Sequence, residues 1–162
     1  KLLLGNDDNG KDLHEVIQNN LNFLPNAKSA KSHSLTNSSI ILDSLKEKGI
    51  THECNHLIPA ETGIILKPWW LWNGLIRVPF FWEDDYSCVT TNPCSIDQMI
   101  KREGLKIFDF HPIHIFLNTE SLNRYEKTRE HHSNADILIN YRFSGYGTRS
   151  KFIELLEMSN NQ

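Results

Sequence analysis

The segment that most constrains the fold is Leu105–Asn118, with the sequence LKIFDFHPIHIFLN. Its first half alternates between apolar and other residues in the manner of a β-strand, so Asp109 and His111 are expected on the same face. Pro112 lacks a backbone N–H donor and is expected to end the strand. The sequence therefore predicts a carboxylate and an imidazole at the carboxyl end of a strand, where ligands commonly bind in α/β folds. A structural alternative stays open, in which these two side chains satisfy each other or nearby backbone groups in a buried strand.

The preceding half of the chain has the order typical of a β–α–β unit: a polar loop, a helix, a glycine and then a strand near Ile50. The helix is expected over Asn37–Lys48, with Thr36 as its cap and Gly49 as its stop. Apolar periodicity and end signals predict further helices, one of them opened by a capping box, over Lys11–Leu24, Ser95–Arg102, Glu120–His131 and Arg149–Met158.

Length and composition limit the classes of function. The chain has 162 residues, enough for a single domain over 1–162 with a sizeable core. Lys and Arg total 17 against 20 Asp and Glu, so no basic excess exists to bind the phosphates of a nucleic acid. No apolar stretch reaches the ~20 residues that cross a bilayer. Three cysteines without metal-type spacing fit a reducing compartment, and the cytoplasm is the expected location.

The segment His52–His56 matches the H-E-x-x-H pattern of zinc peptidases. That chemistry requires a helix, so that both histidines project from one face and the glutamate reaches the water on the metal. Gly49 and Pro59 flank the segment closely and leave no room for an ordinary helix. The peptidase hypothesis therefore fails if this segment is extended.

Arg77 lies among apolar residues in a predicted strand that ends in an acidic corner. A buried arginine is costly unless a carboxylate pairs with it, and the nearest carboxylates in sequence are Glu83, Asp84 and Asp85. The tryptophans of the preceding segment, GIILKPWWLW, suit either the apolar faces of sugar rings or the edge of the core, and the core is the favoured interpretation.

Three pieces of sequence carry a resemblance to a known family: SHSLTNSS at 32–39, IRVPFFWEDD at 76–85 and GLKIFDFHPIHIFLN at 104–118. Together they resemble the NodB-like polysaccharide deacetylase superfamily, and more narrowly the WbmS-type proteins of bacterial surface-polysaccharide loci. The resemblance runs from about Leu2 to Leu156. It implies an α/β fold, a partial distorted (β/α) barrel of which this chain would be the C-terminal larger part, with the active site at the carboxyl ends of the strands.

The resemblance also implies a divalent metal, usually zinc, which activates a water against an acetamide or ester carbonyl. His33 is implied as a metal ligand, Arg77 as the residue that orients a catalytic carboxylate, and His111 as the general acid. Asp109 is a further catalytic candidate on the face of His111. Four residues close to these motifs are expected to contact the carbohydrate substrate: Trp82, Glu83, Asp84 and His114.

Two motifs depart from the pattern of the superfamily. The paired aspartates of the early motif are absent, because Gly5–Gly10 is interpreted as a solvated turn, and Asn37 stands where the second metal-binding histidine is expected. The metal site is therefore expected to be incomplete in this chain, and the full-length protein is expected to remove N- or O-acetyl groups from a bacterial surface polysaccharide or its precursor. The alternative is a catalytically inactive relative that binds sugar or serves as a scaffold.

Overall fold

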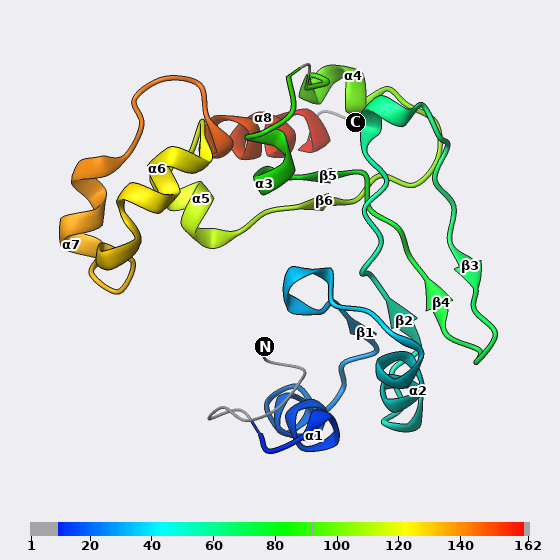
Figure 1. The fold of residues 1–162 in the computed structure, drawn as a ribbon. Coiled ribbons are helices and arrows are strands. Elements are labelled where there is room, and N and C mark those ends of the chain that lie inside the picture. The colour runs from blue at the N-terminus through cyan, green and yellow to red at the C-terminus, as the bar shows by residue number, and fades with distance from the viewer. Residues whose placement is uncertain (1–9, 92, 161–162) are drawn as a thin grey trace. The chain divides into compact units, whose positions relative to one another are not determined.

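The computed structural model describes residues 10–91 and 93–160 (Figure 1). The chain divides into two compact units, which are described one at a time. Unit 1 contains the chain up to Ile58 together with Leu66–Phe80, and unit 2 contains Pro59–Ile65 and the chain from Phe81 onward. The turn expected at Gly5–Gly10 lies outside the described residues except for Gly10, and the single domain over 1–162 stays a prediction.

Unit 1 is built on a four-stranded sheet in the order β1-β2-β4-β3, in which β1, β2 and β4 are parallel and β3 forms an antiparallel hairpin with β4 (Figure 1). The β–α–β prediction is confirmed, since α2 connects the parallel strands β1 and β2. The elements of unit 1 are α1 (Leu13–Phe23), β1 (Ser29–Ala30), the 3-10 helix η2 (His33–Leu35), α2 (Ser39–Glu47), β2 (His52–Glu53), β3 (Trp69–Trp70) and β4 (Ile76–Arg77).

The core of unit 1 lies where α1 and α2 pack on the sheet. Buried side chains of both helices meet buried residues of the sheet, namely Ile17, Ile41, Leu42, Leu45, Ile50 and Leu75. The cap of α2 is Ser38 rather than the predicted Thr36, because the Ser38 hydroxyl accepts a hydrogen bond from the backbone N–H of Ile41 at 3.3 Å. Gly49 adopts a φ of 82° just after the helix, as expected for a residue that ends one.

Unit 2 combines a two-stranded parallel sheet with several short helices (Figure 1). Trp82 pairs with Phe108 and Glu83 pairs with Asp109 across the two strands. Its elements are η3 (Ala60–Thr62), β5 (Trp82–Glu83), α3 (Asp84–Ser87), α4 (Ile96–Ile100), β6 (Phe108–Asp109), α5 (Pro112–Leu117), α6 (Leu122–Lys127), η4 (Arg129–His131), α7 (Ala135–Leu138), η5 (Ile139–Tyr141) and α8 (Thr148–Asn160).

The segment Leu105–Asn118 contains a shorter strand than its alternation predicts. The strand is short, covering only Phe108–Asp109, and Pro112 begins helix α5 instead of only ending the ladder. A proline fits the first helical position because its missing N–H would have no partner there in any case. The capping box of Ser95 and Gln98 is confirmed at the start of α4. The helix expected over Glu120–His131 is divided between α6 and η4.

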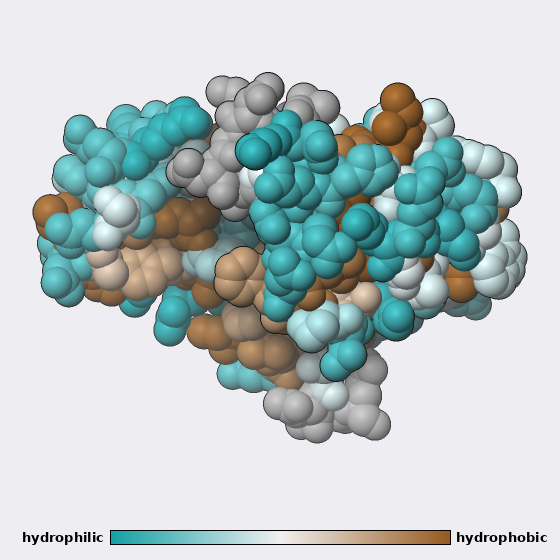
Figure 2. Space-filling view, turned by 90° about the horizontal axis from the view of Figure 1, so that it is seen from below, coloured by the Kyte–Doolittle hydropathy of each residue, from teal (hydrophilic) through white to brown (hydrophobic). Residues whose placement is uncertain are grey.

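The fold is mixed α/β, as predicted, but the described residues form no closed barrel. No helix in the described part of the chain is long and apolar enough to cross a membrane. In the space-filling view, polar residues cover most of the visible face, and apolar residues form separate patches between them (Figure 2).

Asn118 ties the end of α5 to the turn before α8. The residue adopts a left-handed φ of 51°, which asparagine tolerates well. Its side-chain amide donates hydrogen bonds to the carbonyls of Phe143 (2.9 Å) and Gly145 (2.8 Å), and its carbonyl oxygen accepts one from the N–H of Ser150 (3.2 Å). A side chain added at Gly147 would lie 2.1 Å from the backbone oxygen of Asn118, so this contact requires a glycine.

The substitution Gly147→Ala is expected to lower the free energy of unfolding by about 3 kcal/mol, because the new methyl group meets backbone that cannot move aside. Denaturant unfolding followed by circular dichroism measures the change. The matched control is Gly145→Ala, whose methyl group meets only the ring of Phe143, which can rotate away. Equal stability of the two variants would contradict the proposed close approach at Gly147.

Candidate active site

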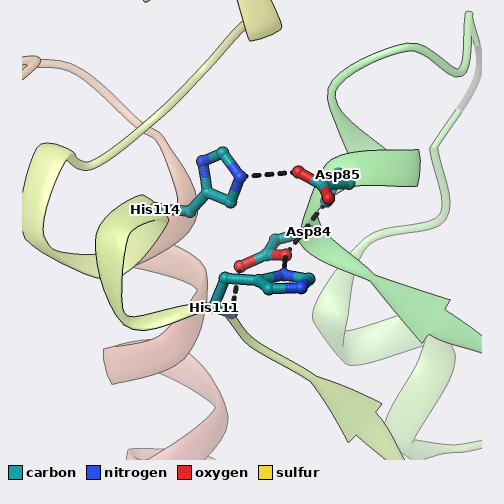
Figure 3. Close-up of side chains that lie close together, drawn as sticks. All are labelled: Asp84, Asp85, His111 and His114. Carbon is teal, nitrogen blue, oxygen red and sulfur yellow. Dashed lines mark hydrogen bonds and ion pairs between the residues drawn. The ribbon is translucent and has the colours of Figure 1, made fainter. Parts of the chain in front are cut away.

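Both strands of unit 2 lead directly into helices, and this brings two pairs of polar side chains together. Strand β5 runs into α3, which begins at Asp84, and β6 is followed by His111 and then by α5, which begins at Pro112. Because β5 and β6 are parallel, the two helix starts lie at the same edge of the sheet. Asp84 and Asp85 from α3 face His111 and His114 from the second strand–helix junction (Figure 3).

Asp84 binds His111 through both oxygens of its carboxylate. One oxygen accepts from Nδ1 of the imidazole at 2.6 Å, and the other accepts from the backbone N–H of His111 at 2.7 Å. The first oxygen also accepts from the N–H of Asp85 at 3.0 Å. The side chain of Asp84 is 0% exposed, whereas that of His111 is 39% exposed. The buried carboxylate therefore fixes the orientation of a histidine that can reach a ligand through Nε2.

This contact changes the acid–base properties of His111. The hydrogen bond to Asp84 raises the pKa of His111 above its ordinary value, against the opposing effect of burial. A raised pKa keeps the ring protonated to higher pH. The protonated pair stabilises the fold fully below the ordinary pKa of histidine, and this stabilisation is lost as the pH rises through the raised pKa.

Asp85 and His114 form a second pair beside the first one. Nε2 of His114 lies 2.5 Å from a carboxylate oxygen of Asp85, and Nδ1 lies 3.0 Å from the hydroxyl of Thr119. His114 is buried and its ring packs against Tyr125, with the centroids 5.0 Å apart. The rings of His111 and His114 meet edge to face (Figure 3). Both nitrogens of His114 are thus engaged, one with Asp85 and the other with Thr119.

A third group of polar side chains lies on the strands themselves. Glu83 and Asp109 are direct neighbours in the β5–β6 register, and one ligand atom of each lies within 4.8 Å of the other and of a nitrogen of His111. Two carboxylates opposite each other on neighbouring strands repel unless a cation or a shared proton lies near them. A protonated His111 supplies positive charge close to this pair.

Comparison with known proteins identifies the family. The sequence model of the WbmS-like polysaccharide deacetylases matches residues 2–129. The chain belongs to this family. A crystal structure of WbmS from Bordetella bronchiseptica, described as a polysaccharide deacetylase involved in O-antigen biosynthesis, is 36% identical in sequence and superposes with a TM-score of 0.79. A comparison with curated proteins finds no match.

The resemblance to the WbmS-like family is thereby confirmed. The matched structure covers 91% of this chain, whereas the chain spans 62% of the length of that protein. The predicted fold class is confirmed at the level of a mixed α/β structure similar to a deacetylase.

Five of the residues singled out from the sequence gather in unit 2: Glu83, Asp84, Asp109, His111 and His114. Trp82 belongs to the same unit but lies in its core, where its ring contacts Phe110 with the centroids 4.6 Å apart. Its predicted contact with substrate is not favoured by this burial. Asp85 was not among the predicted site residues, although its place in the WEDD corner next to Asp84 was the signal that could have identified it.

Arg77 and His33 belong to unit 1 of the WbmS-like chain. The expected pairing of Arg77 with the acidic corner is wrong: its Nε donates to the carboxylate of Glu53, which lies directly opposite Arg77 in the β2–β4 register. Sequence proximity was misleading because neighbouring parallel strands are distant in sequence. His33 is exposed in η2, just after strand β1.

The zinc peptidase hypothesis is wrong. The segment His52–His56 begins as strand β2, and its buried and less buried residues alternate as they do in an extended chain. Glu53 therefore points toward Arg77, while His56 lies on the opposite side of the alternation, with its ring edge to face with Trp69. This geometry cannot place two histidines and a glutamate around one metal as a helix does.

The tryptophans of the β3–β4 hairpin are not part of the core, contrary to the favoured expectation. Trp69, Trp70 and Trp72 are all exposed. Trp69 also lies under the guanidinium of Arg77, with 6.0 Å from the central carbon to the ring centroid. A short hairpin at the edge of the sheet leaves its side chains without a second layer to cover them.

The family implies a divalent metal, which needs several free ligand atoms that lie close together. In the described ranges, both groups of three or more potential ligands lie in unit 2, and neither contains His33. The larger group, made of Asp84, Asp85, His111 and His114, has the donor types that zinc accepts. Its members are nevertheless arranged as two Asp–His pairs, and three N–H groups already occupy Asp84. As arranged, these residues do not fit a resident metal.

The substitution Asp84→Asn is expected to lower the pKa of His111 toward its ordinary value, because an amide cannot balance the charge of an imidazolium. A pH titration of the imidazole signals by NMR measures the shift. The matched control is Asp97→Asn, since Asp97 pairs with Lys101 on the surface of α4 and should leave His111 unchanged. An unaltered pKa in the Asp84 variant would contradict the electrostatic role of Asp84.

Proposed function

We propose that the full-length protein is a carbohydrate deacetylase in which His111, oriented by Asp84, transfers the proton to the leaving group. The observation that carries the proposal is the pairing of a fully buried Asp84 with a partly exposed His111 at the carboxyl edge of a parallel sheet. This is the arrangement of a carboxylate that orients a histidine for acid–base chemistry. The family membership supplies the reaction class, and WbmS supplies the association with surface-polysaccharide synthesis.

The chemistry follows from the groups that the chain provides. Asp84 holds Nδ1 of His111, so Nε2 is the atom that faces a bound acetyl sugar. After water has added to the acetyl carbonyl, the tetrahedral intermediate collapses by breaking its bond to the nitrogen or oxygen of the sugar. The protonated ring donates from Nε2 to that atom, and acetate leaves. The raised pKa of His111 favours this role, because the ring is then protonated before the reaction begins. The carboxylates of Asp85 and Glu83 also raise the pKa of His111 and so stabilise the imidazolium.

We further propose, from the family, that the full-length protein forms a distorted (β/α) barrel, with this chain as its C-terminal larger part. Its substrate would be an N- or O-acetylated bacterial surface polysaccharide or its precursor, in a cytoplasmic location. Nucleic acid is not an expected partner, since the formal charge of the chain is −3. The catalytic and substrate-contacting roles of Arg77, Asp109, Glu83 and His114 are part of the same proposal.

The substitution His111→Ala in the full-length protein is expected to lower kcat for acetate release by about a thousandfold, within the range of ~10² to 10⁴ that a positioned general acid contributes. Acetate released from acetylated oligosaccharides is measured by a coupled assay. The matched control is His14→Ala, because His14 is an exposed histidine on α1.

Two outcomes would contradict the proposal. Equal activity of the His111 and His14 variants would remove the proton-transfer role. Binding of oligosaccharides, followed by tryptophan fluorescence, without any acetate release by the wild-type protein would favour the alternative of an inactive sugar-binding relative. The exposed Trp70 and Trp72 are the observation that favours this second candidate, because indole faces stack on sugar rings.

The resemblance also predicts a divalent metal, zinc, with His33 as one ligand in the full-length protein. When bound, such an ion polarises an acyl carbonyl and lowers the pKa of water. Metal analysis of the purified protein is expected to find zinc, which His33→Ala loses and His114→Ala retains. Loss of zinc only in the His114 variant would instead place the ion at the Asp–His pairs of unit 2.

A further inference from the structure

The segment that resembles a zinc-peptidase motif carries a buried network in unit 1. Glu53 is 0% exposed and Asn55 is 5% exposed, and the two point to the same side of the extended chain. One carboxylate oxygen of Glu53 accepts from Nε of Arg77, and the other accepts from the backbone N–H of Asn55 at 2.9 Å. Both oxygens of this buried carboxylate are therefore satisfied, one by a charge and one by backbone.

The network continues from Asn55 to the chain that follows strand β1. The carbonyl oxygen of the Asn55 side chain accepts from the backbone N–H of Ser32 at 2.6 Å, and its amide donates to the Ser32 hydroxyl at 3.3 Å. Ser32 is buried, and it is the residue immediately before His33. Asn55 thus holds the chain at the point where the turn of η2 begins.

This turn has an unfavourable backbone conformation. Ser34 and Leu35 adopt φ values of 53° and 52°, in the left-handed region that residues with side chains rarely adopt. Such conformations persist where the surrounding structure enforces them, and they are concentrated at functional sites. The two hydrogen bonds from Asn55 to Ser32 connect the turn to the buried sheet. A cavity of about 320 Å³, lined in part by Ser32 and His33, lies beside it.

The network joins three neighbouring strands at one edge of the sheet. One row of the sheet contains Ala30 of β1, Glu53 of β2 and Arg77 of β4. Two residues after this row, just past the ends of β1 and β2, lie Ser32 and Asn55. The carboxyl ends of parallel strands form the usual binding edge of α/β proteins. A continuous series of contacts therefore connects Arg77, through Glu53 and Asn55, to the turn that carries His33.

We propose that Glu53 and Asn55 are positioning residues, which fix the turn carrying His33 relative to Arg77 at this edge. The expected effect on catalysis rests on the proposed function. Neither the resemblance nor the family match assigns a role to Glu53 or Asn55. Glu53 neutralises Arg77 and holds the N–H of Asn55, and Asn55 holds Ser32. Neither residue touches substrate, since both are buried.

The test compares Asn55→Ala with Asn73→Ala in the full-length protein. Asn73 is a matched control because it makes two comparable hydrogen bonds in the same unit, to Asp43 and to the N–H of Leu75, in the β3–β4 hairpin. Asn55→Ala is expected to speed amide hydrogen exchange at Ser32 by about tenfold, the effect of losing one hydrogen bond. It is also expected to lower kcat for acetate release by at least as much, with little change in KM. The control should alter neither quantity.

A second variant, Glu53→Gln, tests the other half of the network. An uncharged amide can accept from only one of the two donors and leaves Arg77 without its counter-charge, so the same loss of protection at Ser32 is expected. Should this variant fail to fold, Asn55→Ala still decides, because it leaves the ion pair intact.

The outcomes separate this inference from the proposed function. Exchange at Ser32 that is unchanged by Asn55→Ala overturns the inference whatever the activity. Faster exchange with an unchanged kcat overturns the positioning role and leaves only a structural one. If the wild-type protein releases no acetate, the proposed function fails, whereas faster exchange at Ser32 still supports the hold of Asn55 on the turn.

Discussion

A fully buried carboxylate at the end of a strand is the constraint on which the site of unit 2 depends. Removing Asp84 from water is costly unless both of its oxygens find donors, and three N–H groups from two segments meet this requirement. Two of these donors belong to His111, so satisfying the carboxylate brings the start of α5 to the start of α3. The contact that joins the starts of α3 and α5 therefore also orients the imidazole.

Unit 1 uses the same device with a different partner. Glu53 is as completely buried as Asp84, is the last residue of a short parallel strand, and is satisfied by one charged side chain and one backbone N–H. In unit 2 the carboxylate binds His111 directly, whereas in unit 1 Glu53 binds the N–H of Asn55, and the Asn55 side chain binds Ser32, the residue before His33. Breaking a buried pair of this kind by removing one partner typically costs about 3–5 kcal/mol, because a buried charge then remains uncompensated. Such carboxylates stabilise the structure, and in the proposals made above they also position histidines.

The sequence predicted which residues belong to the site better than it predicted which side chains they contact. Alternation and the position of Pro112 placed Asp109 and His111 at the end of a strand, and the WEDD corner was recognised as acidic. The partner of Arg77 was missed because register between parallel strands depends on which strands become neighbours, and local sequence does not reveal this. The segment between Gly49 and Pro59 was too short for an ordinary helix, and in an extended segment Glu53 and Asn55 share one face, which is the face that the structure buries.

The sequence left a structural and a catalytic interpretation open for Asp109 and His111. The structural interpretation expected its aspartate and histidine to satisfy each other, and His111 is indeed satisfied by a carboxylate, although that carboxylate is Asp84 from the neighbouring strand end rather than Asp109. Asp109 instead lies opposite Glu83, where two carboxylates share the vicinity of the imidazole. Asp84, Asp85 and Glu83 all raise the pKa of His111, so several carboxylates stabilise its protonated form. The residue that Asp84 uses to join the two helix starts is therefore also the proton donor of the proposed function.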